Sequence, residues 1–126
     1  TRLIKSNLGI TRVNNENIGL PDKCAAPVTS TQGTNAVITW TAPTNDGGST
    51  IIAYLVEIWC PYSLTMNEET VNCDGSNPNI VSAKTCIIPL AVLQAAPFSI
   101  TVGNYIQATV KAINANYIGP SSEFGS

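Results

Sequence analysis

The chain has 126 residues, a net charge of −2 at pH 7, and only 11% charged residues. This length suffices for one domain around a single core, and the low, slightly acidic charge argues against binding to nucleic acid. The sequence has no histidine, which excludes metal sites and acid–base catalysis that depend on imidazole. No apolar run reaches the ~18–20 residues of a membrane-spanning helix, so this piece predicts no membrane span.

The first residues repeat a pattern that recurs near the C-terminus. Residues 13–19 align with residues 113–119 at a constant offset of 100 (residue 14 against residue 114), with identities at Asn14, Ile18 and Gly19. This match predicts that the first twenty residues are the tail of a preceding repeat unit. Chance similarity between two Asn-rich turns is the alternative.

Residues 37–58 predict a strand, a loop and a second strand. Ile38 and Trp40 lie on one face of the first strand, which ends at Pro43 because proline has no N–H to donate. The sequence Asn-Asp-Gly-Gly-Ser at 45–49 then turns the chain, and apolar residues alternate again from Tyr54 onward.

Two further strands are predicted downstream. Residues 86–93 read as a strand and its exit, and residues 104–114 alternate at period two. The second of these strands ends Val-x-Ala-x-Asn and is followed by a loop, residues 115–120, that contains glycine.

These blocks resemble fibronectin type III domains. The resemblance rests on the Trp, the Pro soon after it, the Asp-Gly-Gly loop, the Ile and Tyr that begin the next strand, and the Val-x-Ala-x-Asn ending, and it covers about residues 26–124. The chain departs from the family at Ile106, where the family has a Tyr whose hydroxyl ties the corner between two strands. The sequences around 73–76, 86–90 and 97–103 further resemble tandem fibronectin type III-like repeats of large secreted or surface proteins of ciliates.

The resemblance implies an all-β fold, a seven-stranded antiparallel β-sandwich of immunoglobulin-like type with an N-terminal strand extension. Residues 1–23 are then a strand segment or linker, and residues 24–126 are the domain. The expected core consists of Val37, Trp40, Tyr54, Val56, Ile58, Ile88, Leu93, Ile106, Ala108, Val110 and Ala112.

The expected interaction residues are apolar side chains outside this core. Trp59 projects outward from its strand, and it either packs under a loop, contacts another subunit, or offers a platform for a sugar. The loop after the last predicted strand carries a second apolar tip. The full expected interface is Leu8, Ile10, Val13, Trp59, Tyr117 and Ile118, and it would contact copies of the same chain or adjacent repeats.

The four cysteines predict disulfides and an oxidising compartment, with buried free thiols as the alternative. Cys73 and Cys86 bracket a turn-rich stretch and are expected to bond within the chain. In the topology that the resemblance implies, Cys24 and Cys60 lie at opposite poles, about 20 Å or more apart. They cannot bond within one sandwich, and we expect them to link successive units. No Cys-x-x-Cys pair is present, which argues against zinc.

The sequence predicts a non-catalytic protein, without cofactor, that is extracellular or at the cell surface. The adjacent acids Glu68 and Glu69 are expected to point apart and to be solvated, so they do not form a catalytic pair. The first functional hypothesis is a structural repeat that assembles head to tail in an array or filament. The alternative is a recognition module that binds a sugar or protein through its loops and exposed aromatic residues. Any glycan would be O-linked, for example on residues 29–31, because the chain has no N-glycosylation sequon.

Overall fold

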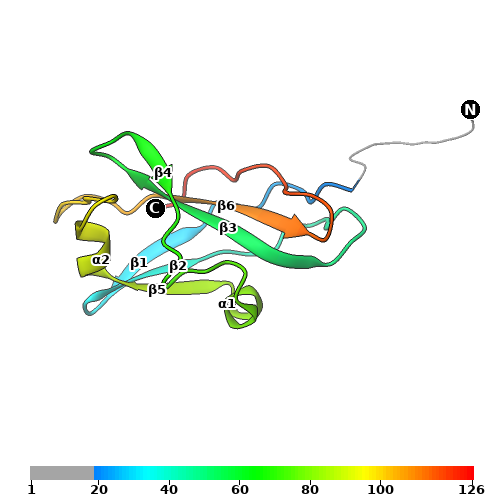
Figure 1. The fold of residues 1–126 in the computed structure, drawn as a ribbon, viewed down its shortest axis with the longest axis horizontal. Helices are drawn as coiled ribbons and strands as arrows, with labels where there is room; N and C mark the ends of the chain where they lie inside the picture. Colours follow the sequence, from blue (N-terminus) through cyan, green and yellow to red (C-terminus); the bar gives the residue numbers. More distant parts are fainter. Residues whose placement is uncertain (1–18) are drawn as a thin grey trace, which may run out of the picture.

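The structure is a computed structural model that describes residues 19–126. Two three-stranded antiparallel sheets pack face to face (Figure 1). One sheet has the order β1 (Val28–Gln32), β2 (Asn35–Thr39), β5 (Thr85–Pro89), and the other has the order β4 (Thr65–Asn67), β3 (Ile51–Cys60), β6 (Ala108–Asn114). Two short helices, α1 (Pro78–Ala83) and α2 (Leu90–Gln94), flank β5 in the sequence. None of the helices in residues 19–126 is long and apolar enough to cross a membrane.

The core lies between the sheets, where the inward side chains of the alternating strands meet. The expected core residues are buried there, except Val37 and Ile106, which are half-buried. The expectation for Val37 was wrong because β2 turns Ala36 and Ile38 inward, and its period of two leaves Val37 on the opposite face. The edge of the Trp40 ring meets the Tyr54 ring at a centroid distance of 5.5 Å in the centre of this core.

Residues 19–126 form six strands rather than the seven expected from the sequence. The final segment, residues 117–125, occupies the position beside β6 where a seventh strand would lie. Gly119, Ser122 and Gly125 donate their N–H groups to alternate carbonyls of β6, at 2.8, 3.0 and 2.9 Å. Each step of two residues along β6 therefore takes three residues of this segment. Such repeated bulges interrupt the ladder, and no regular strand forms.

The corner between β5 and β6 is held without the tyrosine that fibronectin type III domains have at the position of Ile106. Phe98 and Ile100, both buried, insert from the loop after α2 into the core. The Ile100 N–H donates to the carbonyl of Leu93 at 2.9 Å, and the Thr29 hydroxyl of β1 donates to the carbonyl of Ile106 at 2.8 Å. Apolar anchoring and a bond from β1 to the loop before β6 thus take the place of the single hydroxyl contact.

The stretch between Cys73 and Cys86 is a turn followed by helix α1, where the sequence suggested turns alone. Asn77 is the N-cap, its side chain accepts from the Asn79 N–H at 2.9 Å, and Pro78 follows in the first turn. An Asn-Pro pair at these positions favours a helix start, because asparagine satisfies a free N–H and proline lacks one. Lys84 ends the helix in the left-handed conformation.

The molecule has two distinct ends (Figure 1). We call N-terminal pole the end formed by Gly19, Leu20 and the loops of residues 41–50 and 115–118. We call far pole the opposite end, which carries the β1–β2 and β3–β4 turns, α2 and the loop of residues 95–107. The described chain begins at the N-terminal pole and passes to the far pole along several strands.

Candidate interaction surfaces

Asn114 joins three loops at the N-terminal pole. Its side-chain amide donates to the carbonyls of Gly19 and Asp46, at 2.7 and 2.9 Å. Its side-chain oxygen accepts from the N–H groups of Asn116 and Tyr117, at 2.9 and 2.8 Å. Asn114 is 2% exposed, so these four bonds are made away from bulk water and hold the pole in one arrangement.

The segment before β1 packs closely on the loops of this pole. Pro21 is fully buried, and the Asp22 N–H donates to the carbonyl of Asn45 at 2.9 Å. A Cβ on Gly119 would lie 2.8 Å from the Pro21 carbonyl oxygen, which explains why glycine stands there. The expected domain boundary between residues 23 and 24 falls inside this packed stretch.

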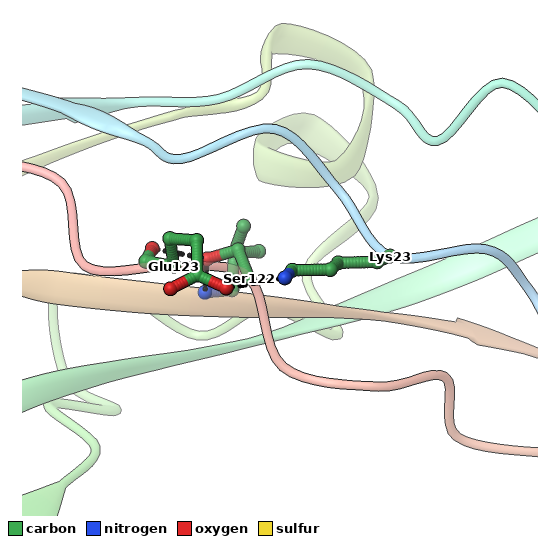
Figure 2. A network of polar contacts seen from close by, with 4 residues as sticks. Lys23, Ser122 and Glu123 are labelled. Carbon is green, nitrogen blue, oxygen red and sulfur yellow. Dashed lines mark hydrogen bonds and ion pairs between the residues drawn. The ribbon is translucent and has the colours of Figure 1, made fainter.

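The segment before β1 is also joined to the last residues of the chain by an ion pair. Figure 2 shows Lys23 reaching toward Glu123, with which it forms an ion pair, beside Ser122. The hydrogen bond and the charge of Lys23 lower the pKa of Glu123. Both side chains are largely exposed, so the pair contributes little to stability. The Ser122 hydroxyl is buried, accepts from the Val110 N–H at 3.0 Å and donates to the Glu123 carbonyl.

Cys73 and Cys86 are joined by a disulfide, with their Cα atoms 5.1 Å apart. The bond connects the loop after β4, which belongs to one sheet, to β5 of the other. The disulfide closes a loop of the chain that contains α1. Both cysteines are buried.

Cys24 and Cys60 are free thiols inside the core, with exposures of 3% and 0%. Burial raises the pKa of the Cys24 thiol, which keeps it in its unreactive protonated form. The Cys60 sulfur accepts from the Asn67 side-chain amide at 3.2 Å. A bond between copies needs both sulfur atoms at the surface. The link between units that the sequence predicts stays a prediction, and it would require both sulfur atoms to leave the core.

Trp59 packs within its own chain. Its ring is half-buried and meets Phe124 edge to face at a centroid distance of 6.1 Å. The backbone N–H of Trp59 donates to the carbonyl of Gln107 at 2.9 Å. A neighbouring hollow of about 270 Å³ is lined by Phe124 and by the ion pair of Glu57 and Lys111, but not by Trp59. Of the roles expected for Trp59, packing is the one this geometry supports.

Large apolar side chains are exposed at both poles. At the N-terminal pole Leu20, Tyr117 and Ile118 are 38%, 48% and 56% exposed. At the far pole the exposed set is Tyr62, Leu64, Val102 and Tyr105, at 78%, 71%, 88% and 85%. Tyr117 and Ile118 thus lie at the surface as the sequence indicates. Leu8, Ile10 and Val13, the other expected interface residues, lie outside the described residues.

The far-pole residues were missed by sequence reasoning. Tyr105 lies in the stretch predicted as a strand, and Val102 lies just before it. A strand through both positions would have turned one of the two side chains inward. The strand begins instead at Ala108, and the residues before it form an open loop. The sequence signal available for this loop was Gly103, because glycine adopts positive φ values readily. In the structure the φ of Gly103 is +93°.

The acidic residues Glu68 and Glu69, which are adjacent in the sequence, differ in burial. Within residues 19–126 no three His, Cys, Asp or Glu residues lie close enough together to hold a metal ion. Glu69 is buried and accepts from the N–H groups of Val71 and Asn72, a structural role in a turn. Its neighbour Glu68 is exposed.

Proteins of known structure share the fold of this chain. No family model matches the sequence, and no curated protein does. Among solved structures, domains A168–A170 of titin superpose with a TM-score of 0.60 at 19% identity, over 85% of this chain and 31% of that one. The sixth fibronectin type III domain of human fibronectin type III domain containing protein 3 superposes with a TM-score of 0.56 at 20% identity, over 82% of this chain and 80% of that domain.

The twitchin kinase region of C. elegans superposes with a TM-score of 0.60 at 14% identity, over 85% of this chain and 16% of that one. This chain thus spans less than a third of the titin and twitchin chains it resembles. At these identities the likeness shows the fold, which is a fibronectin type III-like β-sandwich. It gives no support to the narrower resemblance to ciliate repeats.

Proposed function

We propose that this domain is a non-catalytic structural unit of an extracellular array, in which copies or adjacent repeats stack head to tail. The observation that carries the proposal is the exposure of large apolar side chains at both poles of one sandwich. Apolar groups of this size are usually covered when they cluster on a surface. Two apolar ends on one body favour contacts that repeat along its long axis.

The path of the chain supports the same arrangement. The described residues begin at the N-terminal pole, and Ser126 lies beside Asn104 and Tyr105, which belong to the far-pole loop. Consecutive repeats in one polypeptide would therefore follow one another pole to pole. The rigid attachment of Gly19 through Asn114 would fix the direction in which the preceding segment leaves.

An extracellular location is part of this proposal. The Cys73–Cys86 disulfide persists in oxidising compartments and is rare where glutathione keeps thiols reduced. The hydroxyls of β1 suit an O-linked glycan at Ser30 and Thr31, which are exposed, better than at Thr29, whose hydroxyl is bonded to Ile106.

The alternative function, a recognition module, has less support from Trp59, because its ring packs against Phe124. Tyr62 and Tyr105 remain as exposed aromatic residues at the far pole. Within the stacking proposal these two side chains belong to the contact between units.

Sedimentation velocity over a range of concentrations tests the stacking. The substitution Ile118→Asp puts a charge into the apolar N-terminal pole and is expected to shift the chain toward monomer. Ile87→Asp is the matched control, since Ile87 is 54% exposed on β5, away from both poles. A chain that is monomeric at every concentration, or an Ile118→Asp variant that associates as the unsubstituted chain does, would overturn the proposal.

A further inference from the structure

We infer that an apolar pocket at the far pole receives the side chain of Ile118 from a second copy. This inference rests on the proposed head-to-tail function and names the residue and the pocket through which two units meet. Ile118 lies at the N-terminal pole, where it is 56% exposed.

The pocket lies between α2 and the loop of residues 100–106 and has a volume of about 180 Å³. An enclosed apolar cavity of about 150 Å³ can hold a benzene molecule, so this pocket is large enough for one apolar side chain. Its buried wall residues, Leu93 and Ile100, are both apolar. The polar side chains that line it are all exposed, and they are Thr31, Gln94, Thr101 and Asn104.

The distribution of charge marks both poles as contact surfaces. Residues 19–126 carry ten charged side chains, seven acids and three lysines. Within these residues the far pole has none, and the N-terminal pole has only Asp46, whose carboxylate accepts from the Gly48 N–H at 2.8 Å. Charged residues are depleted and tyrosines enriched at the centres of protein interfaces, and the far pole exposes Tyr62 and Tyr105. The two poles can therefore meet with little charge to strip of water.

Ile118 fits the pocket better than its apolar neighbours do. The Tyr117 ring already lies over Gly19, because a Cβ on Gly19 would be 2.6 Å from its Cε2 atom. A tyrosine hydroxyl would also need a hydrogen-bond partner among apolar walls. Leu20 is less exposed than Ile118, at 38%. Ile118 has no polar side-chain atom and is the most exposed of the three.

The backbone around Ile118 is held in place before any contact forms. The Asn114 N–H donates to the Tyr117 carbonyl at 3.0 Å, and the Gly119 N–H donates to the Ala112 carbonyl at 2.8 Å. A side chain presented by a fixed backbone loses little conformational entropy on binding.

The same fixed position selects a second copy over the chain's own pocket. Ile118 forms a bridge with Ile113 near the end of β6, whereas Ile106, which lines the pocket, precedes the start of β6. The six steps from Ala108 to Asn114 separate these places by about 20 Å. Ile118 is bound to one end of the sandwich and the pocket lies at the other, so the side chain can enter only the pocket of another copy.

A matched pair of substitutions in the full chain tests whether Ile118 leaves water. Ile118→Val and Ile118→Thr have nearly the same shape, but threonine carries a hydroxyl that the apolar pocket cannot satisfy. In sedimentation velocity we expect Ile118→Val to associate much as the unsubstituted chain does and Ile118→Thr to associate about tenfold more weakly. Equal association of the two variants would overturn the inference, since it would leave the side chain in water.

Disulfide trapping identifies the pocket as the partner. A chain with Ile118→Cys is mixed with one that carries Val102→Cys, while the native free thiols stay buried. Mild oxidation is expected to give a band of twice the chain mass that reductant removes. In the control Val71→Cys replaces Val102→Cys, because both valines are 88% exposed but Val71 lies outside the pocket.

The outcomes separate this inference from the function on which it rests. A mixed band no stronger than the control overturns the inference, and so does an equally strong band from Ile118→Cys alone, which would join like poles. If the unsubstituted chain still associates and Ile118→Asp still weakens that association, head-to-tail stacking stands and only the pocket contact is wrong. If the unsubstituted chain is monomeric at every concentration, both fail.

Discussion

At the scale of single residues, the N-terminal pole depends on one buried amide. Asn114 uses both of its side-chain N–H groups on two carbonyls and its oxygen on two backbone N–H groups. No other side chain of similar size carries donors and acceptors in this arrangement. The same residue type stands at Asn14, at the matching place in the N-terminal repeat pattern, and the preceding unit that this match predicts stays a prediction.

Replacing Asn114 is expected to weaken the fold and to release Gly19. Asn114→Ala removes four hydrogen bonds at a buried site and should lower the free energy of unfolding by about 2–4 kcal/mol. Asn114→Asp keeps the acceptor but loses both donors, and should release Gly19 while leaving the turn at 116–117 in place. Urea denaturation and amide exchange measure the two effects.

Asn116→Ala is the control for this pair, because Asn116 is exposed in the same loop and bonds through its backbone. Its effect should stay within about 0.5 kcal/mol. Equal losses of stability for Asn114→Ala and Asn116→Ala would show that Asn114 does not organise the pole.

At the scale of elements, the segment of residues 117–125 is the least regular part of the sandwich. It bonds to β6 through repeated bulges, and one β6 donor is satisfied by a side chain rather than by a carbonyl, since the Val110 N–H donates to the Ser122 hydroxyl. A bulged edge of this kind is a poor template for an added strand. In the other sheet, β1 pairs with β2 in an unbroken antiparallel register.

Ser122→Ala is expected to leave the buried Val110 N–H without an acceptor and to lower the free energy of unfolding by about 1–3 kcal/mol. Ser121→Ala, at an exposed neighbouring position, should have little effect. Hydrogen exchange at the Val110 amide is the direct readout. An unchanged exchange rate in Ser122→Ala would mean that the backbone, not the hydroxyl, holds this edge.

The disulfide is the covalent tie between the two sheets. Its loop is closed by cysteines 13 residues apart, so its loss should cost about 3 kcal/mol in the chain-entropy description. Chains with Cys73→Ala and Cys86→Ala together should show this loss in denaturation, with the thiols of Cys24 and Cys60 unchanged as an internal control. Peptide mapping that finds Cys73 and Cys86 free in freshly isolated protein would contradict the pairing.

Much of this element-scale description could be predicted from the sequence. The alternation in β3 and β6 and the turn at 45–49 are local patterns, and they located two strands, their loops and most of the core. The seventh strand could not be excluded in this way, because bulges depend on the partner strand and leave no periodic mark. The burial of Cys24 and Cys60 and the packing of Trp59 stood among the alternatives from the sequence, which could not select them or identify Phe124 as the partner of Trp59. Each depends on residues distant in the sequence, which the pattern around a single residue does not reveal.

At the scale of the whole molecule, exposed apolar side chains at both poles make the sandwich suited to serial association. The sandwich fold by itself is compatible with many functions. The proposed function depends instead on how the exposed residues are distributed over this fold. The central claim is that the apolar side chains at the two poles hold neighbouring units together.

The most direct measurement compares the full chain with a chain that begins at Gly19. This start keeps the bond from Asn114 to Gly19, which a cut at residue 20 would remove. Circular dichroism should show the same sandwich in both chains, and sedimentation velocity should show association of both, because the shortened chain keeps both apolar poles. A shortened chain that folds but stays monomeric while the full chain associates would contradict the account, and so would one that no longer folds.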